Sequence, residues 1–321
     1  MARPGHEVDV LVRPRRAPRV EVERPAAAEP ETNVRLAEQP GELANERELS
    51  LGRGVHRAVV SLRLPAKIPV SPRRQLGQHF LVDENILGVI GRLAELDSSD
   101  VVLEVGPGLG ILTRYLADRV ARVHAVEIDR SLAPPLADLP PNVELEFGDA
   151  LAVDLGRLEP TKLVANLPYS VATPLVVESL DRLPTVRDWC VMVQREVADR
   201  FFAEPGTKAY GAVSVLVQLA AKRTGFHPVA RTVFRPQPNV DSALVAFRRV
   251  SQPEGVPWRD LKSMVEAAFA HRRKTLPNSL ELAGLASRER TAEALAAVGR
   301  PARARAEELE PPEFVALAET L

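Results

Sequence analysis

Residues 101–110 read Val-Val-Leu-Glu-Val-Gly-Pro-Gly-Leu-Gly, a short apolar run that leads directly into a glycine-rich turn. Such a continuous run is typical of a buried strand in a parallel sheet with both faces covered. The glycines allow the backbone to turn sharply and to approach a ligand closely. Their Gly-x-Gly-x-Gly spacing differs from the Gly-x-Gly-x-x-Gly of dinucleotide-binding proteins. The stretch therefore predicts a ligand cradle that is not built for a pyrophosphate, although a plain tight turn is the alternative.

Strands and helices alternate on the carboxyl side of this stretch. Apolar runs predict further strands at 123–128, 142–147, 163–165 and 189–193. Helical periodicity recurs at 111–118, 174–180, 195–202 and 212–221, with Thr173 available to cap the second of these helices. Two late strands, at about 223–230 and 242–248, follow with no helix between them. The pattern predicts an α/β fold with a doubly wound, Rossmann-like sheet that ends in an antiparallel edge strand.

The two ends of the chain differ from this middle part. Residues 1–68 are rich in Arg, Glu, Pro and Ala and lack hydrophobic periodicity, which predicts a disordered N-terminal extension. A passive extension is favoured there over a weak RNA-binding arm. Residues 251–321 repeat at helical spacing, and Gly284 and Gly299 are predicted helix stops. We therefore expect a catalytic domain at 69–250 and a small all-helical domain at 251–321.

The composition limits the functions and the kinds of site that the chain can have. The net charge is −1, from 42 basic and 43 acidic residues, so any RNA contact must come from local basic patches. The chain has a single cysteine, Cys190, which lies in an apolar run. One cysteine alone cannot form an intramolecular disulfide or a cysteine zinc cage. Six scattered histidines give no support for a metal site. Without a membrane-length apolar stretch or a signal peptide, a cytoplasmic protein is expected.

Three carboxylates follow predicted strands. Glu127 ends the strand at 123–128, about 20 residues after Gly106, where a carboxylate can accept both hydroxyls of a ribose. Asp129 is more simply explained as a helix cap before Ser131. Asp149 follows the strand at 142–147 and is placed to accept an adenine amino group, unless it is only a turn residue after Gly148.

The tetrapeptide Asn166-Leu167-Pro168-Tyr169 follows the apolar run at 163–165, at the strand end where α/β proteins bind ligands. An exocyclic adenine amine is conjugated to its ring and is therefore poorly nucleophilic. The Asn166 side-chain oxygen and the Pro168 main-chain carbonyl can accept its two hydrogens, which favours pyramidal geometry and directs the nitrogen lone pair at a methyl group. Tyr169 offers a ring face on which an extruded base can stack. A tight turn is the alternative for the tetrapeptide alone.

Together these motifs indicate a methyltransferase that uses S-adenosylmethionine and acts on the exocyclic nitrogen of adenine. The glycine spacing disfavours a nicotinamide oxidoreductase, and the sequence contains no P-loop, no Ser-His-Asp order and no His-Glu-x-x-His. Basic runs at 73–74, 248–249 and 271–274 are candidate phosphate contacts, although a solvated charged face is the default for each. The run at 271–274 is favoured because it lies in the predicted helical domain.

The chain from about Arg73 onward resembles the bacterial small-subunit ribosomal RNA adenine dimethyltransferases, the kasugamycin-sensitivity enzymes. About three-quarters of the chain matches in order, with highly specific motifs. The matching motifs are Gly77-Gln78-His79-Phe80-Leu81, residues 104–110, Glu127-Ile128-Asp129, Gly148-Asp149-Ala150, residues 166–169, Gln194-Arg195-Glu196-Val197, Ala209-Tyr210-Gly211, residues 233–243 and His271-Arg272-Arg273-Lys274-Thr275-Leu276.

The resemblance implies transfer of four methyl groups to two adjacent adenosines in a hairpin loop near the 3′ end of 16S ribosomal RNA, within an immature small subunit. It also implies a monomer and a set of site residues. The cofactor-binding residues would be His79, Leu81, Gly106, Gly108, Glu127, Asp149 and Asn166. The catalytic residues would be Asn166, Pro168, Tyr169 and Phe234, the last as a second wall of the base pocket. RNA contacts would be Arg272, Arg273 and Lys274.

The sequence departs from the family pattern at three positions. The family often has Asn at His79 and at Ser170, and Arg at Pro277, so a side-chain contact at His79 and one RNA contact are in doubt. Two other functions stay open. One is a large-subunit ribosomal RNA adenine methyltransferase of the antibiotic-resistance type, which the late motifs disfavour. The other is an assembly factor without catalysis, which the intact tetrapeptide and carboxylates disfavour.

Overall fold

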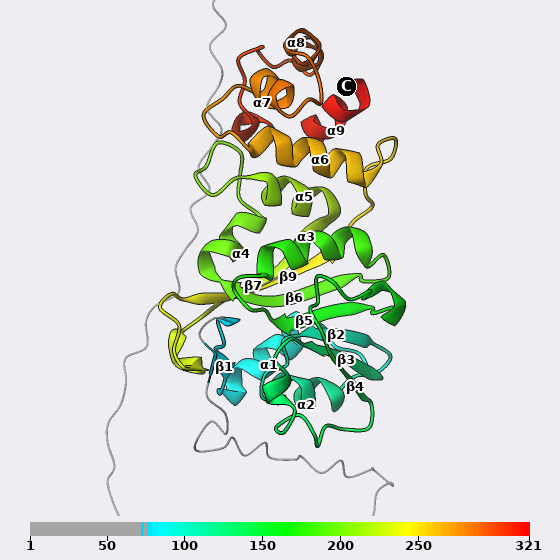
Figure 1. Cartoon of the computed structure of the whole chain (residues 1–321), viewed down its shortest axis with the longest axis vertical. Coiled ribbons are helices and arrows are strands. Elements are labelled where there is room, and N and C mark those ends of the chain that lie inside the picture. Colours follow the sequence, from blue (N-terminus) through cyan, green and yellow to red (C-terminus); the bar gives the residue numbers. More distant parts are fainter. Residues whose placement is uncertain (1–71, 74–75) are drawn as a thin grey trace, which may run out of the picture. The chain divides into compact units, whose positions relative to one another are not determined.

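The computed structural model describes residues 72–73 and 76–321 (Figure 1). The predicted N-terminal extension at 1–68 lies outside the described residues. Within them, a seven-stranded sheet with the order β4-β3-β2-β5-β6-β9-β7 forms the centre of the fold. Its strands are β2 (Val101–Val105), β3 (Arg122–Glu127), β4 (Val143–Phe147), β5 (Lys162–Asn166), β6 (Asp188–Gln194), β7 (Ala221–Val229) and β9 (Ser242–Arg249).

The sheet is parallel from β4 to β6, as the alternating pattern predicts. One detail of the prediction is wrong: the antiparallel strand is not at the edge. β9 runs antiparallel to both of its neighbours and is inserted between β6 and the edge strand β7. Because β7 pairs antiparallel with β9, β7 runs in the same direction as the parallel strands β2 to β6.

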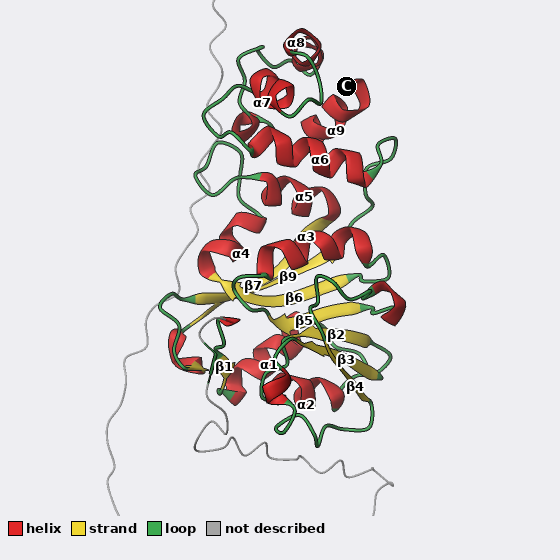
Figure 2. Cartoon of the chain, viewed as in Figure 1, coloured by secondary structure: helices red, strands yellow, loops and turns green. Residues whose placement is uncertain are grey.

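Both faces of the central strands are buried, which explains their continuous apolar runs. Successive residues of a strand point to opposite faces. Accordingly, Val102 belongs to one hydrophobic cluster and Leu103 to another. The cluster around Val102 is covered by α1 (Glu84–Leu93) and α2 (Ile111–Ala117), and the cluster around Leu103 by helices on the other face (Figure 2). These other helices are α3 (Ala172–Arg182), α4 (Arg195–Phe201) and α5 (Ala212–Ala220).

The start of α3 corrects a second prediction. Thr173 does not cap this helix, which begins at Ala172 with Val171 as its N-cap residue. The Val171 amide donates to the Pro168 carbonyl at 3.1 Å, and the Leu175 amide donates to the Val171 carbonyl at 2.9 Å. The turn after Pro168 thus continues directly into the helix, so Thr173 lies inside its first turn.

Short elements complete this part of the chain. A two-stranded sheet pairs β1 (Phe80–Leu81) with β8 (Phe234–Arg235), with Leu81 opposite Phe234. Asp83 caps α1 by accepting a hydrogen bond from the Asn85 amide at 2.8 Å. β1, β8 and α1 were not predicted from the sequence. Single 3₁₀ turns occur at η2 (Arg130–Leu132), η3 (Gly156–Leu158), η4 (Arg231–Val233) and η5 (Ala306–Glu308).

The helical pattern beyond residue 253 is confirmed. The helices are α6 (Trp258–Phe269), α7 (Leu276–Leu282), α8 (Arg288–Ala297) and α9 (Pro311–Thr320). Gly284 and Gly299 follow α7 and α8 with φ of +71° and +75°, the left-handed conformation that ends a helix. Trp258 and Phe314 belong to the same hydrophobic cluster as the residues of α3 and α5, so these helices share a core with the sheet.

Cys190 is buried in β6, and burial raises the pKa of its thiol to about 12, as expected for an inert apolar residue. Among the described helices, none combines the length and the apolarity that a membrane span requires.

Candidate active site

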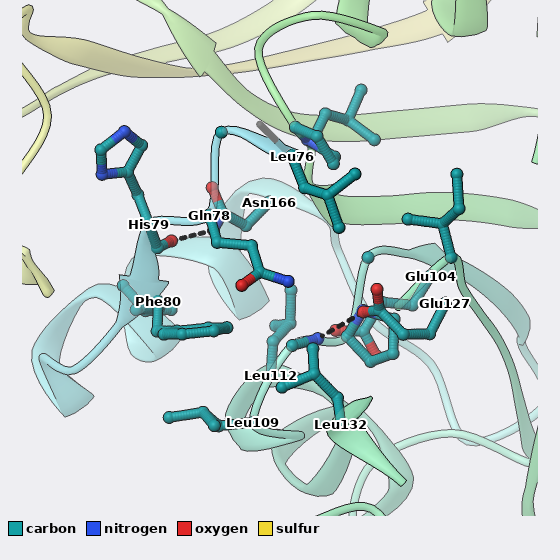
Figure 3. Close-up of a pocket in the computed structure, with 18 of the residues that line it drawn as sticks. Leu76, Gln78, His79, Phe80, Glu104, Leu109, Leu112, Glu127, Leu132 and Asn166 are labelled. Atoms are coloured by element: carbon teal, nitrogen blue, oxygen red, sulfur yellow. Dashed lines mark hydrogen bonds between the residues drawn. The ribbon is translucent and has the colours of Figure 1, made fainter. Parts of the chain in front are cut away.

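A cavity opens at the carboxyl ends of β2, β3 and β5, where ligands bind in open α/β sheets (Figure 3). Three segments of the chain line it. They are the stretch before α1 (Leu76 to Leu81), the glycine loop with the neighbouring ends of β2 and β3 (Glu104, Gly106 to Leu109, Ile111, Leu112, Glu127, Ile128 and Leu132), and the tetrapeptide Asn166 to Tyr169. Six of the seven predicted cofactor-binding residues, all except Asp149, therefore meet here with Pro168 and Tyr169.

The glycine loop requires glycine for two reasons. Gly106 has φ +75° and Gly108 has φ +58°, in the left-handed region that other residues avoid. A Cβ atom at Gly106 would lie 3.3 Å from the Pro168 ring. The cradle and the tetrapeptide therefore touch directly, and a side chain at Gly106 would push them apart.

Glu127 is fixed at the centre of the cavity. Its side chain is buried, and its Oε2 accepts a hydrogen bond from the Gly108 amide at 3.1 Å while Oε1 accepts one from the Asp129 amide at 2.9 Å. Burial raises the pKa of this carboxyl above its ordinary range. Asp129 caps the next turn by accepting a bond from the Ser131 amide at 3.0 Å, which confirms its structural interpretation.

Glu104 is a cavity residue that was not singled out from the sequence. Its side chain lines the cavity at 1% exposure, and its Oε2 has no hydrogen-bond partner among the described residues. Burial raises the pKa of Glu104 to about 8. The signal was present in the sequence, because a lone acidic residue interrupts the apolar strand Val-Val-Leu-Glu-Val.

The ends of β3 and β4 lie beside each other. The Gly148 amide donates to the Glu127 carbonyl at 2.9 Å, which brings Asp149 to the same edge of the sheet. Asp149 itself is exposed, and its Oδ1 accepts a bond from the Leu151 amide at 2.9 Å, as in an Asx turn. Ile128 lines the cavity at 53% exposure, an apolar surface that the sequence analysis missed.

The tetrapeptide presents its polar groups at the end of β5. Asn166 donates through Nδ2 to the His79 carbonyl at 3.3 Å, which orients its amide at the cavity edge. The Pro168 carbonyl accepts one hydrogen bond, from the Val171 amide, and a carbonyl oxygen has a second lone pair for another donor.

Tyr169 and His79 lie next to each other at the mouth of the cavity. The Tyr169 hydroxyl hydrogen-bonds the Ser242 Oγ at 2.6 Å, and burial raises the pKa of this phenol. Its ring centroid is 5.6 Å from that of His79. The His79 Nδ1 lies 2.8 Å from the Pro236 carbonyl, so its ring points away from Glu104 and Glu127 (Figure 3). The side chain of His79 thus binds a loop, and its main chain faces the cavity.

Phe234 is not brought to the cavity surface. It is 1% exposed and belongs to the same buried cluster as Phe80 and Leu81, because the β1–β8 pairing turns its ring into the core.

The basic run at 271–274 lies among the C-terminal helices, but it is a turn between α6 and α7 and not part of a helix. α6 ends at Phe269, and the Lys274 amide bonds the His271 carbonyl at 2.9 Å in a turn before α7. Pro277 in the first turn of α7 prevents one continuous helix. Arg272, Arg273 and Lys274 are all exposed. Arg272 is bound to the Glu307 carboxylate at 3.2 Å and to the Lys208 carbonyl at 3.1 Å.

The other basic runs have structural partners. Arg248 pairs with Asp188 and Glu95, and Arg249 donates to main-chain carbonyls that include Val186 at 2.7 Å. Arg73 lies 3.3 Å from Asp129. Within residues 72–73 and 76–321, no group of His, Cys, Asp and Glu side chains is arranged to hold a metal ion.

The doubly wound sheet carries a glycine cradle after β2, a buried carboxylate at the end of β3 and Asn-Leu-Pro-Tyr at the end of β5. This combination defines a Rossmann-like methyltransferase. Residues 70–313 match the family described as ribosomal RNA adenine dimethylase, and the chain belongs to this family.

Three relatives illustrate the similarity. The chain is 47% identical over 252 residues to the Ribosomal RNA small subunit methyltransferase A of Rubrobacter xylanophilus, covering 77% of this chain and 94% of the relative. The structure of the 23S rRNA methyltransferase ErmE is similar with TM-score 0.55 and 32% identity, over 75% of this chain and 99% of that one. A dimethyladenosine transferase from Plasmodium falciparum shares the fold, with TM-score 0.61 and 23% identity over 74% and 96% of the two chains.

Proposed function

We propose that the chain transfers methyl groups from S-adenosylmethionine to the exocyclic N6 amines of two adjacent adenosines in the 3′-terminal hairpin loop of 16S ribosomal RNA. The substrate would be an immature small ribosomal subunit in the cytoplasm. One observation carries the proposal: the tetrapeptide at the end of β5 and the glycine cradle after β2 line a single cavity. A methyl donor and an acceptor base bound to them would therefore meet.

Cofactor binding would use the residues around the cradle. Gly106 and Gly108 would approach the methionine end, together with the main chain of His79 and Leu81. Glu127 would accept the ribose hydroxyls, and Asp149, at the adjacent strand end, the adenine amine. Ile128 would add an apolar surface against the adenine ring. When bound, the cofactor supplies an electrophilic methyl group on a sulfonium centre.

The cavity fits such a cationic cofactor. Glu104 is buried there with an Oε2 that has no partner among the described residues, and a buried charge is stable only with a partner. A sulfonium and an ammonium group would supply positive charge to this carboxylate. The Gly106 cradle, which a Cβ would fill, leaves room for a close approach of the ligand.

Glu104 also gives a testable pH dependence in the absence of cofactor. Because burial raises its pKa to about 8 in the folded state, the protonated form is favoured on folding. This contribution to stability is complete below the unfolded pKa, near pH ~4.3, and is lost as the pH rises towards 8. We expect the Tm of Glu104→Gln to fall less between pH 5 and pH 8 than that of the wild type. Parallel Tm curves for the two proteins would contradict this assignment.

Acceptor binding would use the tetrapeptide. The amine of the target adenine would donate to the Asn166 side-chain oxygen and to the free lone pair of the Pro168 carbonyl. Its ring would stack on Tyr169, which the hydrogen bond to Ser242 holds in place. Phe234 would become a second wall only after the β1–β8 pairing opens, because its ring is buried.

The sequence identities to relatives favour small-subunit RNA over large-subunit RNA as the substrate. Identity to the small-subunit relative is 47%, compared with 32% for the 23S rRNA methyltransferase. The direct test is methylation of immature small subunits with labelled S-adenosylmethionine, followed by mapping of the modified nucleotides. We expect two adjacent dimethylated adenosines in 16S RNA and none in large subunits. Label in 23S RNA alone would contradict the proposal, and no label in any RNA would support an assembly role without catalysis.

The exposed pair Arg273 and Lys274 is proposed to contact RNA phosphates, whereas Arg272 has partners inside the protein. Replacing Arg273 and Lys274 by Ala should weaken binding to small subunits and lower the slope of log affinity against log salt by up to roughly two units. The measurement is affinity across a salt series, with S-adenosylmethionine affinity as the internal control. Arg272→Ala is the matched variant and should change Tm more than the salt slope. Equal slopes for wild type and the double variant would assign these residues to a solvated face.

The division at residues 68 and 250 stays a prediction, as does a monomeric state. The family match begins at residue 70, which supports an N-terminal extension that takes no part in methylation.

A further inference from the structure

A second cavity of about 530 Å³ lies next to the candidate active site and shares no lining residue with it. Its lining includes Gln194, Arg195 and Glu196 from the start of α4 and Asn239, Val240 and Asp241 from the loop before β9. Both stretches belong to the family-matching motifs of the sequence, and the proposed methyl transfer gives neither of them a role. We call this cavity the α4 groove.

The backbone fixes the two sides of the α4 groove against each other. Gln194 pairs with Ser242 at the end of the antiparallel strands β6 and β9. The Arg195 amide then donates to the Asp241 carbonyl at 2.9 Å. Because the Ser242 Oγ is also 2.6 Å from the Tyr169 hydroxyl, one residue connects the groove to the stacking face of the proposed base site. The groove is therefore one residue away from the target base.

Two arginines in the groove are held in position without being buried. The Arg195 side chain is 49% exposed, and its Nε lies 3.0 Å from both carboxylate oxygens of Asp199. Its guanidinium also lies over the Phe226 ring, 4.9 Å from the centroid. Arg231 is 51% exposed and 3.2 Å from Asp241. Guanidinium groups held in this way lose little freedom when they stack on or hydrogen-bond a ligand.

The charges of the groove disfavour a phosphate as its main ligand. Two cations, Arg195 and Arg231, stand against three carboxylates, those of Glu196, Asp199 and Asp241. Carboxylates and amides instead suit the hydroxyls of a ribose and the amino groups of a base, and RNA is read through such groups on unstacked nucleotides. Val240 is 45% exposed in the same groove and offers an apolar surface to a base ring.

A nucleotide with this chemistry must be present during the proposed reaction. When one adenosine is taken out of the loop, its neighbour loses a stacking partner and remains within one nucleotide of the acceptor site. We propose that the α4 groove binds the base and ribose of the nucleotide next to the methyl-acceptor adenosine. This inference rests on the proposed function. It gives the enzyme a way to hold two adjacent adenosines while it modifies each in turn.

The test uses two opposite charges at one exposed position, Val240→Asp and Val240→Lys, in the full-length chain with immature small subunits. Both remove the apolar contact, while Lys should attract RNA and Asp repel it. We expect both variants to raise KM for small subunits about fivefold and to lower the fraction of RNA modified at both adenosines. Tm and S-adenosylmethionine affinity should not change. Ser98→Asp, at an exposed turn before β2, is the control for added charge.

The outcomes separate the possibilities. If Val240→Lys equals or exceeds the wild type while Val240→Asp is impaired, the groove acts only through charge and the inference is wrong. If both variants match the wild type in KM and in product distribution, the groove is only a solvated surface and the inference also fails. Failure of the proposed function itself would show earlier, as a wild-type protein that does not methylate small subunits.

Discussion

Asn166→Ala should lower the rate of adenosine methylation by about 100-fold or more. The side-chain oxygen of Asn166 is proposed to accept a hydrogen bond from the target amine, and this bond strengthens as the nitrogen becomes pyramidal. Loss of one such transition-state contact costs about 3 kcal/mol, which corresponds to a factor of this size in kcat. The measurement is single-turnover methylation of immature small subunits at saturating S-adenosylmethionine.

The matched control is Asn142→Ala, at the opposite end of the sheet. Asn142 donates through Nδ2 to the carbonyls of Ala117 and Val120, so its loss should lower Tm and leave the methylation rate near that of the wild type. Asn166 also donates to the His79 carbonyl, and some loss of cofactor affinity is expected with it. A rate for Asn166→Ala within threefold of the wild type would remove Asn166 from the chemical step.

Glu127→Gln should weaken S-adenosylmethionine binding by roughly 10- to 100-fold. Hydrogen bonds to a charged acceptor contribute about 1.5–3 kcal/mol each, and the neutral amide loses that charge. The amide also has only one oxygen, whereas Glu127 accepts main-chain bonds from both Gly108 and Asp129. One of these amides would lose its acceptor, and the glycine cradle would loosen. Isothermal calorimetry of the protein with the cofactor measures the change directly.

Glu144→Gln is the control for this variant, because it removes an equal charge from the exposed face of β4, where Glu144 pairs with Arg122 at 2.8 Å. It should leave cofactor affinity unchanged. RNA affinity should be close to that of the wild type in both variants. Unchanged cofactor binding in Glu127→Gln would exclude Glu127 as the ribose ligand.

Local patterns in the sequence were sufficient for most of the sheet. The strand Val101–Val105 was predicted because a strand buried on both faces is mostly apolar, here interrupted only by Glu104, and ends at a glycine turn. Helix α1 was missed although Ile86, Leu87 and Ile90 have helical spacing and Asp83 is a good cap. The glycine loop, Glu127 and Asn166 could be predicted for a related reason: they lie at the ends of strands, and parallel strands end at one edge of the sheet. His79 and Leu81 were predicted only from the family resemblance.

The remaining parts of the site depend on contacts between distant segments. β1 and β8 have two residues each, too few for any periodicity, and their pairing joins positions more than 150 residues apart. The same pairing buries Phe234, and no pattern in the sequence distinguishes Phe234 from an exposed aromatic residue. His79 is another case, because only the folded chain brings its ring to the Pro236 carbonyl. The ion pair of Arg272 could not be predicted from the sequence, since its partner Glu307 lies 35 residues further on.

The contact between α5 and the C-terminal helices limits how this enzyme can be engineered. α5 packs against both α6 and α9, and the Tyr210 hydroxyl donates to the Leu309 carbonyl at 2.8 Å. If the last four helices of a relative were grafted onto this chain, their core residues would pack against an α5 with which they did not evolve. A functional chimera must exchange α5 and Tyr210 together with those helices, so the natural crossover point lies near residue 203 and not at residue 250.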